Sequence, residues 1–86
     1  MKIKVKIRNN DDIKYYNQDS HWVSMIVEVL GVIEKSNNSS DMYLDVLETI
    51  KAAGVISFIP QPKSTYILMG DFIYDDKWGW QFKIDG

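Results

Sequence analysis

The segment "SHWVSMIVEVLGVIEKS", residues 20–36, decides the fold class, because it can form either a helix or a strand. Its many β-branched residues favour a strand. Its non-apolar positions are Ser24, Glu28, Gly31 and the pair Glu34 and Lys35, which are separated by four, three and three residues. This spacing is the period of a helix rather than that of a strand. We therefore predict a helix over residues 20–36, capped by Asp19 or Ser20.

The next segment, "SSDMYLDVLETIKAAG" at residues 39–54, has a clearer helical pattern. Ser40 can cap a helix there, and the charge of Asp41 suits the positive end of the helix dipole. An apolar stripe follows at helical spacing, and Gly54 can end the helix in a left-handed conformation. We predict a second helix over residues 40–53.

The remaining apolar runs are typical of strands. Residues 2–8, "KIKVKIR", alternate strictly between apolar and basic side chains. Shorter runs predict strands over residues 55–59, 64–74 and 78–85. The prediction is a single α+β domain over residues 1–86. It has two layers: a mostly antiparallel sheet, packed on one side by the two helices.

The terminal hairpin contains most of the aromatic residues. A three-residue loop over 75–77 places every even-numbered side chain on one face. The pairs would be Tyr74 with Trp78, Phe72 with Trp80, Gly70 with Phe82, and Leu68 with Ile84. We expect most of this face to be core, with Phe82 and Ile84 its surest members. Lys77 would then occupy a position that usually takes Gly or Asn.

The turn end of this face is the candidate partner-binding site. Helix cover is most easily lost there, and Trp and Tyr are enriched at the hot spots of protein interfaces. The candidate residues are Tyr74, Asp75, Asp76, Trp78 and Trp80. A wholly buried aromatic face is the alternative interpretation.

Composition excludes several classes of protein. The chain has 86 residues, is 45% hydrophobic and 26% charged, and has no cysteine, so it is globular without disulfides or thiolate metal sites. The basic start lacks the apolar run of a signal peptide. Residues 22–33 are too few to span a bilayer. We therefore expect a cytoplasmic protein with no membrane partner.

Charge argues against nucleic acid as a partner. The net charge is −2 and the pI is about 5.2. Residues 40–53 with the following hairpin faintly resemble the recognition helix and wing of a winged-helix protein. The acidic side chains of that segment would, however, face phosphate. The basic stripe Lys2, Lys4, Lys6 and Arg8 can be a phosphate-binding strip, but we favour protection of an exposed strand edge.

No pattern in the sequence predicts catalysis, a cofactor or a metal. His21 is the only histidine, and its neighbours Asp19 and Ser20 are adjacent in sequence rather than brought together from separate elements, as a catalytic triad requires. The acidic pairs lie in predicted turns. The run "DFIYDDKWG" lacks the spacing of a calcium loop. We expect no enzyme.

The remaining hypothesis is a small protein–protein interaction module. An inhibitor, a toxin-immunity protein or a phage-encoded antagonist could act by blocking a partner's surface. The alternative is an oligomeric structural or assembly subunit, because residues 22–33 carry more apolar surface than one helix face needs. Those residues would then form a homodimer. A winged-helix-like DNA binder and a small enzyme are less favoured.

Overall fold

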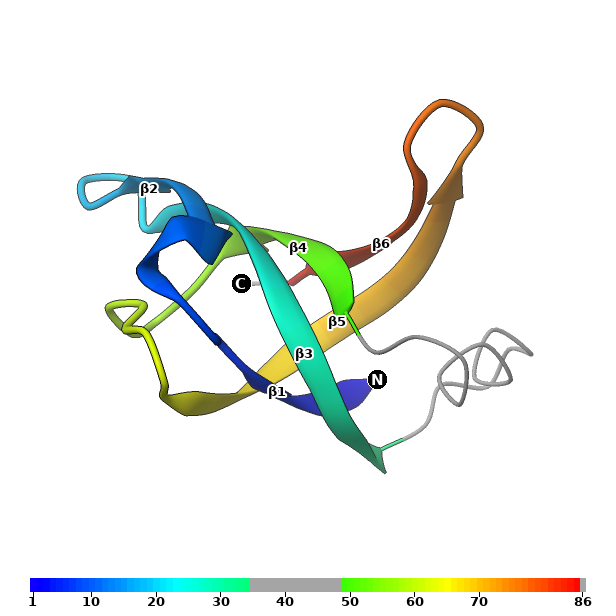
Figure 1. Ribbon diagram of the computed structural model, residues 1–86. Coiled ribbons are helices and arrows are strands. Elements are labelled where there is room, and N and C mark those ends of the chain that lie inside the picture. The colour runs from blue at the N-terminus through cyan, green and yellow to red at the C-terminus, as the bar shows by residue number, and fades with distance from the viewer. Residues whose placement is uncertain (35–48, 86) are drawn as a thin grey trace.

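The computed structural model describes residues 1–34 and 49–85, which are nearly all β-sheet (Figure 1). The strands are β1 (Lys2–Lys6), β2 (Ile13–Asn17), β3 (Trp22–Glu34), β4 (Thr49–Val55), β5 (Thr65–Asp75) and β6 (Gly79–Ile84). The only helical element among the described residues is the short 3-10 turn η1 (Asn10–Asp12).

The sheet closes on itself. Its strand order is β1-β5-β6-β4-β3-β2, and β1 also pairs with β3, so five strands form a ring with β2 added beside β3. All pairs are antiparallel except β4 with β6. Strands β1, β3 and β4 are consecutive neighbours in the ring, and β5 returns to lie beside β1, which is a Greek key. The architecture is a five-stranded Greek-key barrel of the OB type.

Alternating apolar residues of the strands fill the barrel, together with Ile7 and Ile56, which follow β1 and β4. The buried side chains are Ile3, Val5, Ile7, Val23, Met25, Val27, Ile50, Ala52, Ile56, Leu68, Phe72, Phe82 and Ile84. Phe72 and Phe82 meet edge to face, with ring centroids 5.1 Å apart. No polar or charged side chain of the described residues is buried in this core. Figure 1 shows the end of the β5–β6 hairpin projecting away from the barrel.

The predicted helix over residues 20–36 is wrong, because residues 22–34 form β3. Two register shifts explain its misleading pattern. Lys6, Lys4 and Lys2 of β1 pair with Glu28, Gly31 and Glu34 of β3, while Val29 and Val32 pair with Val5 and Ile3. Leu30 and Ile33 are therefore extra residues in two β-bulges. Each bulge lengthens the two-residue strand period to three, which imitates the spacing of a helix.

The predicted second helix is also wrong over the residues that can be compared. Residues 49–53 belong to β4, and residues 40–48 lie outside the described part of the chain. In β4 the buried Ile50 and Ala52 alternate with the outward Thr49 and Lys51, which is the period of a strand. The two-layer α+β prediction is thus replaced by a closed sheet without a helical layer among the described residues.

Gly54 does not end a helix. Its φ is 148°, and a Cβ at this position would collide with the carbonyl group of Ile84. The missing side chain therefore allows β6 to approach β4 closely. The predicted strands 2–8, 64–74 and 78–85 overlap β1, β5 and β6. Of the predicted strand 55–59, only Val55 is in a strand, at the end of β4.

Candidate functional site

The terminal hairpin has a three-residue loop, but its register differs from the predicted one by two residues. Tyr74 pairs with Trp80, Phe72 with Phe82 and Gly70 with Ile84, and the loop is residues 76–78. Leu68, Phe72, Phe82 and Ile84 face the core, as parity indicated, whereas Tyr74 and Trp78 near the turn are exposed.

Local hydrogen bonds select this register. Oδ1 of Asp75 accepts hydrogen bonds from the backbone N–H groups of Lys77 at 2.7 Å and Trp78 at 3.0 Å. Gly79, with φ 79°, takes the left-handed position that the sequence analysis gave to Lys77.

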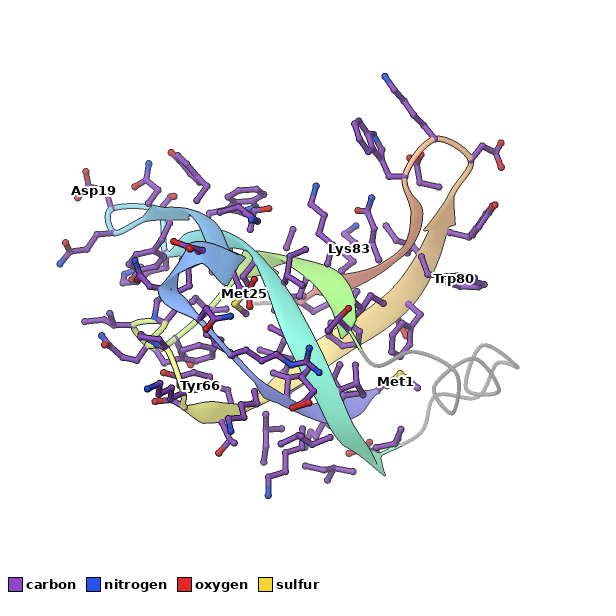
Figure 2. The ribbon with its side chains drawn as sticks, viewed as in Figure 1. Met1, Asp19, Met25, Tyr66, Trp80 and Lys83 are labelled. Atoms are coloured by element: carbon purple, nitrogen blue, oxygen red, sulfur yellow. The ribbon has the colours of Figure 1, made fainter. Side chains whose placement is uncertain are left out.

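The five candidate partner-binding residues are divided between the strands and the loop of the hairpin. Tyr74 packs its ring against Trp80, with centroids 5.3 Å apart and the planes at 60°. Trp78 lies in the loop, is 67% exposed, and contacts two lysines rather than the other rings. The side chain of Asp75 accepts hydrogen bonds within the turn, and Asp76 is exposed in the loop. Figure 2 shows Trp80 at the base of the projecting hairpin.

A broader surface covers the outside of β2, β3, β4 and β6. Paired residues share a face of the sheet, so the register aligns Tyr15, Ser24, Ala53 and Lys83 in one row across these four strands. A second row contains Ile26, Lys51 and Gln81. We call this surface the aromatic–lysine face; it comprises Tyr15, Trp22, Ser24, Ile26, Lys51, Ala53, Gln81 and Lys83 with Lys77 and Trp78 of the loop.

Aromatic side chains lie at two ends of the aromatic–lysine face. At one end the rings of Tyr15 and Trp22 have centroids 5.7 Å apart and are both exposed. At the other end, Nζ of Lys51 and Nζ of Lys77 lie 6.0 and 5.2 Å from the ring centroid of Trp78. These distances permit cation–π attraction, which keeps the Trp78 ring beside positive charge.

Between its two ends, the centre of the aromatic–lysine face carries short side chains. The central positions Ser24 and Ala53 have small side chains. Tyr15 on β2 and Lys83 on β6 are three strand spacings apart, about 14 Å. The face is thus an open platform wide enough for several stacked or extended units of a linear ligand.

Positive charge is concentrated on this platform although the chain is acidic overall. Lys51, Lys77 and Lys83 all belong to the aromatic–lysine face, within a protein of net charge −2. Acidic groups border these lysines: Asp71 is opposite Lys83, Asp75 and Asp76 lie beside the loop residues Lys77 and Trp78, and Glu28 is two residues beyond Ile26 on the same face of β3. A flexible anionic ligand could therefore find local attraction here without a favourable field from the whole molecule.

The remaining predicted features lie elsewhere. His21, with φ 56°, is in the turn before β3, and its carbonyl accepts a hydrogen bond from the N–H of Ile56 at 2.8 Å. The neighbouring N–H groups of Asp19 and Ser20 donate to Oδ1 of Asn17, so these residues stabilise a turn. Residues 1–34 and 49–85 contain no acidic or histidine cluster suited to a metal ion.

The basic stripe of β1 does not protect an edge. β1 pairs with β3 on one side and β5 on the other, so it is an inner strand of the barrel. Lys2 contacts Glu34 at 3.5 Å, and Arg8 contacts Glu28 at 2.8 Å. These exposed ion pairs each contribute little to stability.

Sequence reasoning missed that Tyr15, Trp22 and Lys51 lie on the outside of neighbouring strands. They come from strands that the sequence analysis either left unassigned or assigned to helices. The regular first half of β3, where Val23, Met25 and Val27 alternate with outward residues, was the available signal.

No protein-family model matches the chain, and no curated protein or solved structure matches it. The described residues include no helix with the length and apolar character needed to cross a membrane.

Proposed function

We propose that the protein binds single-stranded nucleic acid on the aromatic–lysine face. The observation that carries this proposal is that the exposed rings of Tyr15, Trp22 and Trp78 lie on the outside of one Greek-key barrel together with Lys51 and Lys83. Barrels of this type bind oligonucleotides on the corresponding strands and on the loops beside them.

The chemistry of the face suits unpaired bases. Exposed aromatic rings stack on the faces of bases with little regard to sequence, and nearby lysines neutralise phosphates. Trp78 and the pair Tyr15 and Trp22 would each support a base. The small side chains of Ser24 and Ala53 leave room for the sugar–phosphate chain between them.

Charge sets the strength and salt dependence of this binding. The argument from net charge concerns the whole molecule, whereas phosphates would meet Lys51, Lys77 and Lys83 locally. Three phosphate contacts to a single strand predict a slope of about −2 for the logarithm of affinity against that of salt concentration. We therefore propose weak binding in which stacking contributes the larger share.

Single strands should be preferred over duplexes. In a duplex the base faces are stacked on one another, so the rings of Trp22 and Trp78 would gain no base to stack on. Only phosphate contacts would remain, and three lysines in an acidic protein provide few of them.

Fluorescence anisotropy tests the proposal. A labelled oligothymidine would be titrated with the full chain at low salt, and a labelled duplex of equal length would serve as the comparison. We expect the single strand to bind. Trp78→Ala should weaken this binding. Tyr74→Ala, which removes an exposed ring outside the face, should leave it unchanged. Equal affinities for single strand and duplex, or equal losses in the two variants, would contradict the proposal.

A second candidate is the protein–protein interaction module predicted from the sequence. The exposure of Tyr74 and Trp78, at 60% and 67%, favours it, because such rings are common hot spots. An inhibitor, immunity protein or phage-encoded antagonist in the cytoplasm could present the hairpin tip to its target. In that case Tyr74→Ala would weaken capture of the target as much as Trp78→Ala.

The proposed homodimer through residues 22–33 would use Leu30, which is 45% exposed at the first bulge of β3. The same contact would join the copies of an oligomeric structural or assembly subunit. Light scattering at high protein concentration tests it: a dimer that Leu30→Glu dissociates is the expected result. A monomer at all concentrations would contradict it.

A further inference from the structure

The wall of the barrel is incomplete beside the first half of β5. Residues Lys2–Lys6 of β1 pair with one edge of β5 from Met69 to Thr65. On the other edge, β6 pairs only as far as Ile84, opposite Gly70, and the N–H of Asp85 adds one bond to the carbonyl of Met69 at 2.8 Å. Figure 2 places Tyr66 at the end of β5 remote from Trp80, beyond the reach of β6.

The backbone polarity of this open edge follows from the alternation of an antiparallel ladder. The N–H of Gly70 donates to the carbonyl of Met1 at 2.9 Å, so even-numbered residues of β5 bond to β1. Odd-numbered residues direct their N–H and C=O groups to the other edge, as the bond from Asp85 to Met69 confirms. Within residues 1–34 and 49–85, the N–H and C=O of Ile67 therefore have no strand to pair with.

An apolar hollow lies along the same edge. Its volume is about 310 Å³, and its walls include Val55, Phe58, Ile67, Leu68 and Met69. The core residues Ile56, Leu68 and Ile84 form its inner wall, and the exposed Val55, Ile67 and Met69 border it, at 43%, 58% and 52%. A free backbone edge beside an apolar hollow is the arrangement that captures an extended peptide by strand addition.

We infer that the Thr65-to-Met69 edge of β5 binds an extended segment of a partner protein in which apolar and acidic residues alternate. In an added strand, side chains alternate between the hollow and the outer face. The apolar residues would enter the hollow while the backbone pairs with Ile67.

Positive charge on the outer face favours acidic residues at the outward positions of the added strand. Lys4 lies in register between Gly31 of β3 and Ile67 of β5, so neither cross-strand neighbour is acidic. Lys6 lies next to Thr65 on the same outer face, but its other cross-strand neighbour is Glu28 of β3, so Lys4 supplies the main attraction for an acidic residue. Asp85 lines the hollow at the opposite end, near Met69, so the acidic residues belong at the Thr65 end.

A second copy of this chain fits the edge less well than such a partner. The outward residues on the β5 edge of a second copy would be Thr65, Ile67 and Met69, none of which is acidic. A second copy would therefore offer Lys4 no opposite charge. This site is separate from the aromatic–lysine face and does not depend on nucleic-acid binding.

Nuclear magnetic resonance of the ¹⁵N-labelled full chain tests the inference. The probe is a short synthetic peptide of alternating valine and glutamate, and the control peptide has lysine in place of glutamate. We expect the first peptide to shift the amide resonances of Thr65, Ile67 and Met69 and to slow hydrogen exchange at Ile67. The lysine peptide should bind more weakly, because Lys4 has no acidic cross-strand neighbour and would repel it.

Three variants distinguish peptide binding at the β5 edge from oligonucleotide binding on the aromatic–lysine face. Lys4→Glu should weaken the valine–glutamate peptide about fivefold while leaving oligothymidine binding unchanged. Lys83→Glu, on the aromatic–lysine face, should weaken oligothymidine binding and leave peptide binding unchanged. Ile67→Pro removes the free N–H without removing a bond to β1 and should abolish peptide binding. Failure of Ile67→Pro to fold leaves Lys4→Glu as the deciding variant.

Three outcomes would overturn the inference. One is the absence of any peptide-induced shift at Thr65, Ile67 and Met69. Another is equal affinity for the glutamate and lysine peptides. The third is a shift of the Ile67 amide with protein concentration alone, which would assign the edge to a second copy. Loss of oligothymidine binding in Lys83→Glu with intact peptide binding would leave it standing.

Discussion

Lys51 of β4 lies over the indole ring of Trp78, with its Nζ 6.0 Å from the ring centroid, although the two residues belong to different parts of the chain. β4 is a wall strand of the barrel, and Trp78 is in the loop of the projecting hairpin. The contact therefore holds an exposed ring of the loop next to the charged row of the barrel. It makes the hairpin loop an extension of the aromatic–lysine face.

Lys51→Gln should reduce the salt dependence of oligothymidine binding. Removal of one phosphate contact from a single strand lowers the magnitude of the logarithmic salt slope by about 0.7. Binding measured over a series of salt concentrations gives this slope. Lys4→Gln, on the other side of the barrel, is the matched control and should leave the slope unchanged.

Trp22→Ala should weaken oligothymidine binding about 5- to 150-fold, the range for losing one stacked base. Its ring is 38% exposed and packs beside Tyr15, so the unfolding free energy should change much less than for a core aromatic. Anisotropy and urea unfolding of the same variant measure both effects. Intact binding after loss of this ring would remove Trp22 from the proposed site.

Phe82→Ala should destabilise the barrel by about 3–5 kcal/mol. Its side chain is fully buried and packs edge to face against Phe72. Urea unfolding followed by circular dichroism measures the loss. The exposed Trp78→Ala provides the comparison and should change stability by less than about 0.5 kcal/mol.

Gly54→Ala and Gly31→Ala should have opposite effects on stability. A Cβ at Gly54 collides with the Ile84 carbonyl, whereas a Cβ at Gly31 meets no atom within 4 Å. Overpacking at Gly54 should destabilise by about 1–3 kcal/mol or more. Alanine at Gly31 should be neutral or stabilising by up to about 1 kcal/mol. Thermal unfolding of the pair checks this, and equal melting temperatures would contradict it.

Deletion of Leu30 should leave the barrel folded, which is unusual for a deletion inside a strand. Leu30 is the extra residue of the first bulge, so its removal brings the inward Val29 next to the outward Gly31 and restores strict alternation. Deletion of Ile26, in the regular half of β3, would instead turn neighbouring side chains to the wrong face. Amide spectra of the two deletion variants distinguish these results. A collapsed spectrum for the Leu30 deletion would contradict the assignment of the bulge.

Parts of the fold could be predicted from local pattern. Strict alternation indicated β1, and parity located the core face of the terminal hairpin, including Phe82 and Ile84. Both inferences needed only the two-residue period of a strand. The register of the hairpin could not be obtained by parity, because it depends on the hydrogen bonds of Asp75 and the left-handed Gly79.

The rest could not be predicted because it depends on pairing between distant strands. The bulges at Leu30 and Ile33 gave β3 a helix-like spacing, and only the register with β1 reveals them. The aromatic–lysine face combines Tyr15, Lys51 and Trp78 from separate elements, which no sequence motif joins. The net charge of the whole chain also gives no sign that three lysines lie on this face.

The place of β1 between β3 and β5 has a consequence for synthesis of the protein. As the chain emerges from the ribosome, β1 can meet β3 early, but its second edge stays open until residues 65–69 have been made. Such long-range closure makes folding slow and leaves a free strand edge in the incomplete chain. Lys2, Lys4 and Lys6 repel other edges during that interval. These lysines would then protect the nascent chain from aggregation, a task that ends once the ring closes.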